Sequence, residues 1–350
     1  MPETLRIAVL AAGSWGTTLA IVLAENGHEV VLWDHDPARA RTIASARQNG
    51  RYLPDVRLPD GVSVTGDLTA AIRDAHMVVL VVPSHTMRET ARALAASGAL
   101  VTDAIVVSAT KGLEEGTHER MSEILAAELK IGRERIVSLV GPSHAEEVSR
   151  HVPTSVVAAG TGVAQCRQVQ EAFGSPYLRI YTNDDIVGAE LATALKNSIA
   201  IAAGILDGAG GGDNTKAALV TRGLSEITRL GLAMGAKAET FSGLAGVGDL
   251  VVTCLSRHSR NRRVGEAIGR GQTLEEALSK LGMVAEGVRT TRAAVDLGRE
   301  RGVELPIIEM VHRVLFEGHD PHEAIQMLMT RPPRAETRGA SSQSGKDKRA

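Results

Sequence analysis

The sequence predicts an α/β fold in which an N-terminal domain with a mainly parallel β-sheet precedes an all-α C-terminal domain. In the first 180 or so residues, short β-branched runs alternate with helical stretches, as in strand-helix-strand units of parallel sheets. After residue 183 the strand signal disappears, and periodic segments rich in Ala, Leu, Glu and Arg continue to about residue 329. A chain of 350 residues also exceeds what one hydrophobic core usually serves.

Seven apolar runs are interpreted as the strands of the first domain: residues 7–10, 30–33, 77–82, 105–108, 136–140, 155–158 and 177–181. The runs at 78–82 and 104–107 are apolar throughout, which is typical of strands covered by helices on both faces. We therefore expect these two strands in the middle of the sheet.

The predicted division is a sheet domain at 1–183, an all-helical substrate domain at 184–330 and a tail at 331–350. A glycine cluster at 208–212 ends the first helix of the second domain, because glycine tolerates left-handed conformations and supplies no side-chain packing. The tail is rich in Pro, Ser and charge with almost nothing to bury, so we expect it to be disordered and assign it no function.

Composition excludes several classes of protein. The formal net charge of -2 and the lack of a long basic stripe argue against a nucleic-acid partner. Cys166 and Cys254 lack any CxxC or Cys/His spacing, so neither a disulfide framework nor a metal site is predicted, and a reducing cytoplasm fits best. The longest apolar run, 199–206, falls short of the roughly 20 residues that a membrane-spanning helix needs, so no membrane span is expected.

A glycine-rich string follows the first strand and continues as a helix. Its strand-turn-helix context is that of a Rossmann-like dinucleotide-binding domain. Gly13 would let the backbone approach a pyrophosphate, and Gly16 would let helix and strand pack closely. Ser14 and Trp15 would offer backbone N–H groups at the positive end of the helix dipole. The string therefore predicts a nicotinamide dinucleotide cofactor.

The end of the second strand bears on which nicotinamide cofactor binds. Asp34 lies eighteen residues past Gly16, near the spacing expected of an acid that binds the ribose, which favours NAD. His35, Arg39 and Arg41 are close enough in sequence to accommodate an adenosine 2′-phosphate, so NADP stays open.

These features also have structural readings. Ala11 replaces the first glycine of the usual motif, and its Cβ restricts the tight turn. Taken alone, the string is also explained by small residues that only let a helix lie on a strand. Asp34, Asp36 and Pro37 can simply turn the chain and start the second helix, and this reading is compatible with ribose binding.

Polar residues follow several strands at the edge where ligands bind in open α/β sheets. Lys111 follows a buried strand directly, where its ammonium could meet a phosphate or a substrate oxygen. Gly141 and Ser143 are typical of a loop in which bare backbone and a hydroxyl approach a ligand. An exposed loop lysine and an ordinary Gly-Pro turn are the alternatives. His85 and His144 are interpreted as helix-start residues.

The apolar segment 188–206 carries two charges, Glu190 and Lys196. Because they are six residues apart on a helix, they point to different faces. A lysine in such surroundings is costly to bury unless it is paired or functional, and partial burial lowers its pKa toward neutrality. We predict Lys196 as the proton donor and acceptor, with Asn197 orienting a hydroxyl or carbonyl. The alternative is a lysine whose stem lies along the domain surface.

Two groups downstream complete the predicted site. Asp249 and Thr253 are four residues apart, so on a helix they share a face that could hold Lys196. A hydroxyl, a guanidinium and an amide then precede an Arg-rich helix start, a combination suited to a phosphate dianion: Ser259, Arg260 and Asn261. A solvated basic helix start is the competing explanation.

With these residues in hand, the chain resembles the bacterial, soluble, NAD(P)-dependent glycerol-3-phosphate dehydrogenases over nearly its whole length. The matching strings are 13–17, 80–84, 109–113, 141–143, 195–197, 246–250 and 259–263. Several independent motifs in the right order make the resemblance specific, whereas the glycine-rich string alone predicts only a dinucleotide binder.

The resemblance implies reversible reduction of dihydroxyacetone phosphate to sn-glycerol 3-phosphate, which supplies the backbone of glycerophospholipids, by a cytoplasmic homodimer using NAD or NADP. It implies Lys196 as the proton acceptor. The implied substrate contacts are Lys111, Gly141, Ser143, Lys196, Asp249, Ser259, Arg260 and Asn261. The implied cofactor contacts are Ser14, Trp15, His35, Lys111, Ala145, Arg260, Val284 and Glu286. Val284 and Glu286 rest on the resemblance alone.

Two other functions stay open at this point. A related hydroxyacid dehydrogenase would read a carboxylate with the same arginine. A non-catalytic nicotinamide-sensing module would leave Lys196 and Asp249 without a task. The sequence also leaves open the choice between NADH and NADPH, feedback control and the oligomeric state.

Overall fold

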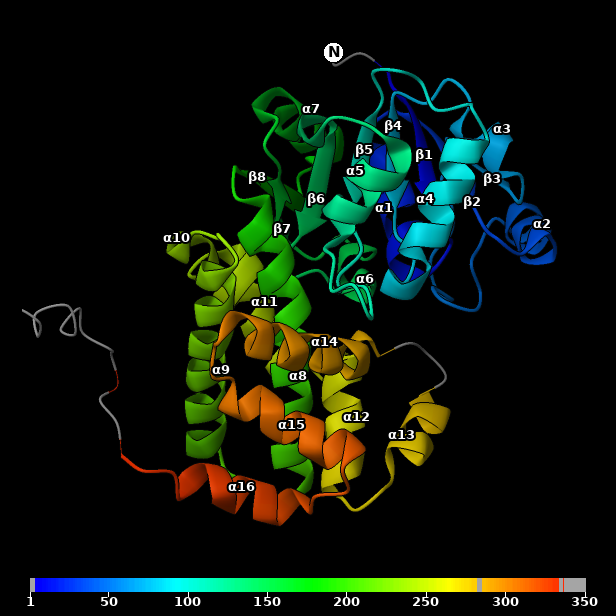
Figure 1. Ribbon diagram of the computed structural model, residues 1–350. Helices are drawn as coiled ribbons and strands as arrows, with labels where there is room; N and C mark the ends of the chain where they lie inside the picture. The colour runs from blue at the N-terminus through cyan, green and yellow to red at the C-terminus, as the bar shows by residue number, and fades with distance from the viewer. Residues whose placement is uncertain (1–3, 282–284, 334–335, 337–350) are drawn as a thin grey trace, which may run out of the picture.

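The computed structural model describes residues 4–281, 285–333 and 336. A Rossmann-like sheet domain lies above an all-helical domain (Figure 1). The eight strands are β1 (Arg6–Leu10), β2 (Glu29–Trp33), β3 (Val62–Thr65), β4 (Met77–Leu80), β5 (Ile105–Ser108), β6 (Ile136–Val140), β7 (Thr154–Ala159) and β8 (Leu178–Asn183). The predicted fold class is therefore confirmed.

The strands form one sheet in the order β3-β2-β1-β4-β5-β6-β7-β8. The first six are parallel, in the order that binds dinucleotides across the carboxyl ends of the strands, where the strand order reverses beside β1. β7 runs antiparallel to β6, and β8 is parallel to β7. β4 and β5, which contain the two apolar runs, lie in the middle as predicted.

The sequence-based prediction did not include β3, and it placed the end of β4 two residues too late. β3 is a four-residue edge strand that contains Ser63 and Thr65, so it lacks the apolar run of the central strands. The predicted strand at 77–82 ends at Leu80. Val81 and Val82 are apolar because they remain in or near the core after the chain has left the sheet.

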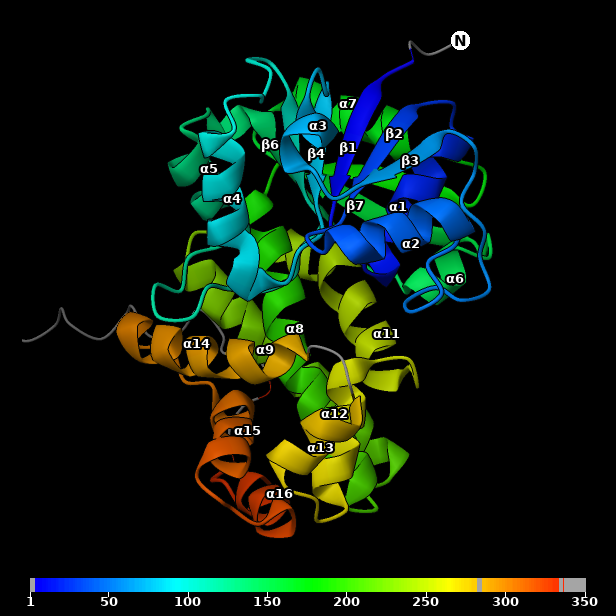
Figure 2. The same ribbon diagram turned by 90° about the vertical axis from the view of Figure 1, so that its right-hand side faces the viewer.

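Helices cover both faces of the sheet (Figure 2). They are α1 (Ser14–Glu25), α2 (Pro37–Ala46), α3 (Leu68–Ile72), α4 (Met87–Ala96), α5 (Met121–Leu129), α6 (Ala145–Val148) and α7 (Val163–Phe173). Ile7 and Val9 of β1 share one core with α1 and α7, whereas Ala8 and Leu10 share the other with α3, α4 and α5. This alternation follows from the two-residue period of a strand.

The described residues of the second domain form helices and the turns that connect them. Its elements are α8 (Ile186–Gly208), α9 (Asp213–Ala233), α10 (Ala238–Phe241), the π-helix η3 (Leu244–Gly248), α11 (Asp249–Leu255), α12 (Arg260–Gly269), α13 (Leu274–Leu281), α14 (Glu286–Arg301), α15 (Pro306–Phe316) and α16 (Pro321–Met329). The 23-residue α8 runs through the middle of this domain (Figure 1).

α8 and α12 pack closely because glycines on both helices face the partner backbone. A Cβ on Gly204 would lie 2.0 Å from the carbonyl oxygen of Arg262, and one on Gly265 would lie 2.1 Å from that of Ile201. Larger residues at these positions would push the helices apart. The close packing brings the start of α12 beside the middle of α8.

Two described stretches, Ile186–Gly208 and Ala238–Leu255, are long and apolar enough to cross a membrane by length and composition alone. The most apolar window of the first is 94% buried inside the protein, and that of the second is 44% buried. Packing in the core explains the composition of α8, and two such stretches are weak evidence for a membrane span.

Candidate functional site

The turn between β1 and α1 leaves backbone N–H groups unpaired at a helix start. Gly13 is the N-cap residue of α1, has extended backbone and makes no side-chain cap. The amide of Thr17 donates to the carbonyl of Gly13 at 2.9 Å, so the amides of the first turn, from Ser14 to Gly16, are left for an anion. A Cβ on Gly13 would meet no atom within 4 Å, so this backbone is open to approach. The turn fits the pyrophosphate of a dinucleotide.

Ala11 keeps this turn at a conformational cost. Its φ is 95°, in the left-handed region that favours glycine. A Cβ on Gly16 would lie 2.0 Å from the carbonyl oxygen of Ala11, so the helix starts in close contact with the turn. The Asn49 amide donates to the carbonyl of Ala12 and to the hydroxyl of Thr17, both at 2.8 Å. No sequence signal pointed to Asn49 as a support of the turn.

At the end of β2, Asp34 faces the protein and not the solvent. It is 1% exposed, its Oδ1 accepts from the amide of Asp36 at 2.9 Å, and Arg39 Nε donates to its Oδ2 at 2.8 Å. That Asp34 binds the ribose and favours NAD stays a prediction. The structural reading holds: Asp36 caps α2, and Pro37 begins it. The side chain of His35 is 73% exposed.

Two lysines from different domains meet one carboxylate. Lys196 on α8 is 4% exposed, and its Nζ donates to Asp249 Oδ1 at 2.7 Å and to the Thr253 hydroxyl. Lys111, in the loop after β5, donates from Nζ to Asp249 Oδ2 at 3.0 Å. The helical face of Asp249 and Thr253 holds Lys196, as their spacing predicted. The burial of Lys196 excludes a lysine lying along the surface.

The environment of Lys196 brings its proton within reach of neutral pH. Burial lowers the pKa of Lys196 to about 8, the Asp249 carboxylate opposes this shift, and the Lys111 ammonium adds to it. The group is therefore mostly an ammonium at pH 7 and about half free amine near pH 8.

The loop after β6 completes this arrangement from the sheet domain. Lys111 Nζ also donates to the carbonyl of Gly141 at 2.7 Å and contacts the Ser143 hydroxyl at 3.3 Å. Gly141 has a φ of 129°, which side chains rarely adopt. A Cβ at this position would also lie 3.2 Å from Val156 Cα, so only glycine fits without strain. Ala145, the first residue of α6, is buried next to this loop.

The helical domain positions Asp249 with an uncommon turn. Asp249 begins α11 directly after the π-helix Leu244–Gly248, a rare element that often occurs at functional sites. A Cβ on Gly246 would lie 2.0 Å from the carbonyl oxygen of Phe241, so the turn is too tight for any other residue. The string at 246–250 thus encodes the placement of one carboxylate.

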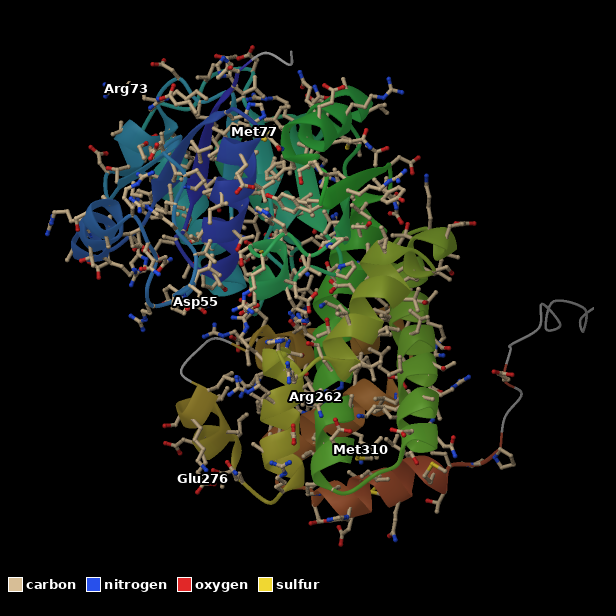
Figure 3. All side chains as sticks on the ribbon, turned by 180° about the vertical axis from the view of Figure 1, so that it is seen from behind. Asp55, Arg73, Met77, Arg262, Glu276 and Met310 are labelled. Carbon is tan, nitrogen blue, oxygen red and sulfur yellow. The ribbon has the colours of Figure 1, made fainter. Side chains whose placement is uncertain are left out.

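The start of α12 offers groups to an anion. Ser259 is its N-cap residue and is buried, and its hydroxyl oxygen accepts from the amide of Arg262 at 3.2 Å. Arg260, the first residue of the helix, is exposed. Figure 3 labels Arg262 near the end of α12 that faces the sheet domain.

Asn261 has protein partners on both ends of its amide. Its Nδ2 donates to Asn197 Oδ1 at 3.0 Å, and its Oδ1 accepts from the amide of Gly287 at 2.9 Å. It therefore ties the start of α12 to Asn197, the neighbour of Lys196, and to the start of α14. A direct substrate contact by Asn261, as predicted, would have to replace one of these bonds.

Two contacts between the domains carried little or no signal in the sequence. Glu286 at the start of α14 accepts from the amide of Ser84 at 3.1 Å and from its hydroxyl. Glu190 faces away from Lys196, as its spacing predicted, and accepts from Arg120 at 2.7 Å and from Ser138 at 2.8 Å. Val284, the remaining predicted cofactor contact, lies outside the described residues.

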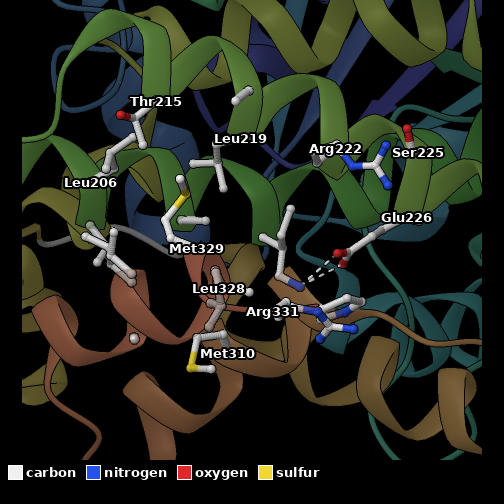
Figure 4. A pocket seen from close by; sticks show the side chains of 18 of the residues that line it. Leu206, Thr215, Leu219, Arg222, Ser225, Glu226, Met310, Leu328, Met329 and Arg331 are labelled. Atoms are coloured by element: carbon white, nitrogen blue, oxygen red, sulfur yellow. Dashed lines mark hydrogen bonds between the residues drawn. The ribbon is translucent and has the colours of Figure 1, made fainter. Parts of the chain in front are cut away.

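Three other kinds of candidate site were sought among the described residues: metal sites, reactive cysteines and cavities. Within them, no group of three or more His, Cys, Asp or Glu side chains is placed to hold a metal ion, and Cys166 and Cys254 are buried free thiols. An apolar cavity of about 880 Å³ lies between α9, α15 and α16 (Figure 4). None of the predicted site residues lines this cavity, so its size does not mark it as the reaction site.

Comparison with known proteins points to one family. The family model described as the NAD-dependent glycerol-3-phosphate dehydrogenase N-terminus matches residues 6–166, and the one described as its C-terminus matches residues 185–326. A glycerol-3-phosphate dehydrogenase (NAD(P)+) of Chlorobium luteolum is 51% identical over 333 residues, which are 95% of this chain and 99% of that relative. One of Pelotomaculum thermopropionicum is 53% identical over 327 residues, 93% of each chain.

A solved structure agrees with these relatives. The crystal structure of glycerol-3-phosphate dehydrogenase from Coxiella burnetii has a TM-score of 0.90 and 38% sequence identity, and the match covers 94% of this chain and 100% of that one.

Proposed function

The chain belongs to the NAD-dependent glycerol-3-phosphate dehydrogenase family, and from this premise we propose that it interconverts dihydroxyacetone phosphate and sn-glycerol 3-phosphate with Lys196 as proton donor and acceptor. The observation that carries the proposal is a buried ammonium, paired with Asp249, where the two domains meet. Bound NAD(P)H supplies the hydride for reduction, and NAD(P)+ accepts it in oxidation.

Lys196 handles the proton. As the substrate ketone carbon receives hydride, its oxygen takes a proton from the Lys196 ammonium; in oxidation the free amine takes the proton back from the hydroxyl. A pKa of about 8 suits both directions, because neither protonation state is far from neutral pH. The free energy cost of burying the charge is offset by Asp249 and Thr253.

Asp249 and Lys111 organise the reacting end of the substrate. The Asp249 carboxylate fixes the position of Lys196 and, through its second oxygen, that of Lys111. We assign Lys111, Gly141 and Ser143 to the substrate oxygens next to the reacting carbon. Since Lys111 comes from the sheet domain and Lys196 from the helical domain, the site is complete only when the domains are together.

The phosphate binds at the start of α12 in this proposal. Arg260, the Ser259 hydroxyl and the unpaired amides of the helix N-terminus are donors suited to a dianion. Binding energy from this remote group would align the carbonyl with the cofactor. Asn261 acts by holding Asn197 beside Lys196.

The turn after β1 would hold the cofactor. We assign its pyrophosphate to Gly13, Ser14, Trp15 and Gly16 and its other contacts to His35, Lys111, Ala145, Arg260, Val284 and Glu286. Two domains divided near residue 183, a homodimer in the cytoplasm and a role in supplying the glycerophospholipid backbone are further parts of the proposal. Family membership argues against the hydroxyacid dehydrogenase and the non-catalytic sensor that the sequence left open.

Substrate preference and one variant test the proposal. We expect purified protein to reduce dihydroxyacetone phosphate and to leave unphosphorylated dihydroxyacetone and hydroxyacids nearly unreacted. Arg260→Ala should raise the KM for dihydroxyacetone phosphate about 10- to 100-fold, because a charge-assisted contact to phosphate is lost.

Arg263→Ala, an exposed arginine on the same helix, is the matched control and should keep the wild-type KM. Hydroxyacids reacting as fast as the phosphorylated ketone would contradict the proposed substrate. An Arg260→Ala variant that melts earlier but keeps its KM would contradict phosphate binding at α12.

A further inference from the structure

The segment that carries Lys111 packs against the helical domain. It runs from the end of β5 to the start of α5, and an antiparallel bridge between Leu113 and Arg120 closes it into a hairpin, here called the Lys111 hairpin (residues 111–120). Leu113 is 2% exposed and lies in the apolar core of the helical domain, in one cluster with Leu191 and Leu195 of α8. This part of the sheet domain is therefore held by the other domain.

A buried ion pair ties the base of the Lys111 hairpin to α8. Arg120 Nη1 donates to Glu190 Oε2 at 2.7 Å, and the two residues are 5% and 4% exposed. Ser122, at the start of α5, donates to the same carboxylate, from its amide to Oε1 at 3.0 Å and from its hydroxyl to Oε2 at 2.6 Å. The Ser138 hydroxyl of β6 donates to Oε1 at 2.8 Å. Each oxygen of Glu190 thus accepts two hydrogen bonds from the sheet domain.

The place of Glu190 on α8 relates this ion pair to the site. Glu190 precedes Lys196 by six residues on one continuous helix, so the two lie about 9 Å apart along its axis. Lys196 and Lys111 both reach the Asp249 carboxylate, at 2.7 Å and 3.0 Å. The hairpin and α8 are therefore joined twice, by Asp249 where the lysines meet and by the ion pair at the base of the hairpin.

The ion pair is better suited to fixing geometry than to adding stability. The cost of taking two charges out of water offsets their attraction, so uncharged residues of similar volume often fold as well. Sliding the hairpin along α8, however, would leave both charges unpaired in the interior, which is strongly unfavourable. The apolar contact of Leu113 has no such directional requirement. The charges of Arg120 and Glu190 thus restrict the hairpin to one position on the helix.

We infer that the Arg120–Glu190 ion pair positions Lys111 relative to Lys196, so that both ammonium groups meet Asp249 in the geometry that turnover requires. Arg120 and Glu190 are positioning residues, since they act through the hairpin and the helix that they join. The inference rests on the proposed function of Lys196 and extends it to a second pair of charges, outside the reacting groups. A small displacement of reacting groups is enough to slow a reaction severely.

A double variant of the full chain, Arg120→Met with Glu190→Gln, tests the inference. It removes both charges and keeps side chains of similar length, and the glutamine oxygen can still accept from the Ser122 amide and the Ser138 hydroxyl. We expect kcat for dihydroxyacetone phosphate to fall about 5- to 50-fold, because the hairpin is no longer fixed on α8. Glu190→Gln alone should lower kcat less, since Arg120 keeps its contact with Glu123.

The pH dependence of ketone reduction reports the position of Lys111 directly. The Lys111 ammonium helps to lower the pKa of Lys196, so its release from Asp249 should move the midpoint of the pH profile above about 8. Losing the Glu190 carboxylate by itself would act in the opposite direction, because a negative charge favours the ammonium. Asp249 and the Cys254 thiol, the other titratable groups that act on Lys196, are unchanged in the variant.

Two comparisons separate positioning from a general structural effect. In a Lys111→Ala background the midpoint is already raised, and adding the double variant should move it no further and lower kcat by about twofold or less, because both changes act through the same lysine. Glu226→Gln is the matched control. This carboxyl is also buried, at 3% exposed, and the substitution should keep the wild-type midpoint and change kcat by about twofold or less.

Wild-type kcat in the double variant, a midpoint that stays or moves down, or the full loss of kcat again in the Lys111→Ala background would each overturn the inference. These outcomes are distinct from failure of the proposed function. The proposed function fails if the wild type does not reduce dihydroxyacetone phosphate or if Lys196→Ala keeps the wild-type kcat.

Discussion

Two buried titratable groups of the helical domain, Lys196 and Glu226, have similar burial and different surroundings. They are 4% and 3% exposed, and burial is the main cause of the pKa shift in each. It lowers the pKa of Lys196 to about 8 and raises the pKa of Glu226 to about 7. By titration alone, both groups would qualify as proton donors near neutral pH.

Their partners separate them. Glu226, labelled in Figure 4, accepts hydrogen bonds from backbone amides at the start of α15. The donors are the amides of Ile307 at 2.8 Å and Ile308 at 3.2 Å. It therefore caps a helix beside the apolar cavity. Lys196 instead meets the side chains of Asp249 and Thr253, next to a lysine of the other domain. A shifted pKa reports burial, and the partners decide between stability and chemistry.

Removing Lys196 should have the largest effect. Lys196→Ala is expected to lower kcat about 10²- to 10⁴-fold, because the alkoxide loses its proton donor, while the Kd for NADPH stays within about twofold. Steady-state kinetics with dihydroxyacetone phosphate and cofactor titration measure the two quantities. A wild-type kcat in this variant would mean that Lys196 is not the proton donor. Lys196 and Glu226 would then no longer differ in function.

Neutralising the partner of Lys196 should have the next largest effect. Asp249→Asn is expected to lower kcat about 10- to 100-fold and to move the pKa of Lys196 below about 8, because the carboxylate that favours the ammonium is gone. The pH at which ketone reduction falls to half its maximum checks this shift. An unchanged midpoint would mean that Asp249 does not act on Lys196.

Glu226→Gln should leave kcat within about twofold of wild type and change only the pH dependence of stability. The Glu226 carboxyl ionises near 4.5 when unfolded and near 7 when folded, so the folded state binds more protons in that window. The free energy of unfolding of the wild type should therefore fall by about 1–3 kcal/mol as the pH rises from about 4.5 to about 7. Gln cannot ionise, so the variant should lack this slope.

Urea unfolding at pH 5 and pH 8 measures the difference between the two proteins. Parallel pH dependence in wild type and variant would contradict the raised pKa of Glu226. A large loss of kcat would contradict its structural role.

Helical spacing was enough to predict much of this contrast. Lys196, Asp249 and Thr253 could be placed because a charge in an apolar helix and a pair four residues apart both have direct geometric meaning. The central strands were predicted for the same kind of reason, since β4 and β5 contain apolar runs. Glu226 drew no prediction, because it lies in a helix with many charges.

Contacts across long sequence separations were not predictable from the chain. Arg120 and Glu190 are 70 positions apart, and no local pattern around either residue indicated their ion pair. Glu286 and Ser84 are 202 positions apart and meet only because the domains pack together. The antiparallel direction of β7 relative to β6 likewise depends on tertiary packing.

The most direct test of the account is the pH dependence of kcat, measured in both directions on the wild type. Ketone reduction needs the Lys196 ammonium and should decline above a pH of about 8, whereas alcohol oxidation needs the free amine and should rise through the same pH. Two limbs of opposite sign with one shared midpoint would support Lys196 as the group that gives and takes the proton. Profiles that are flat, or that move in the same direction, would contradict it.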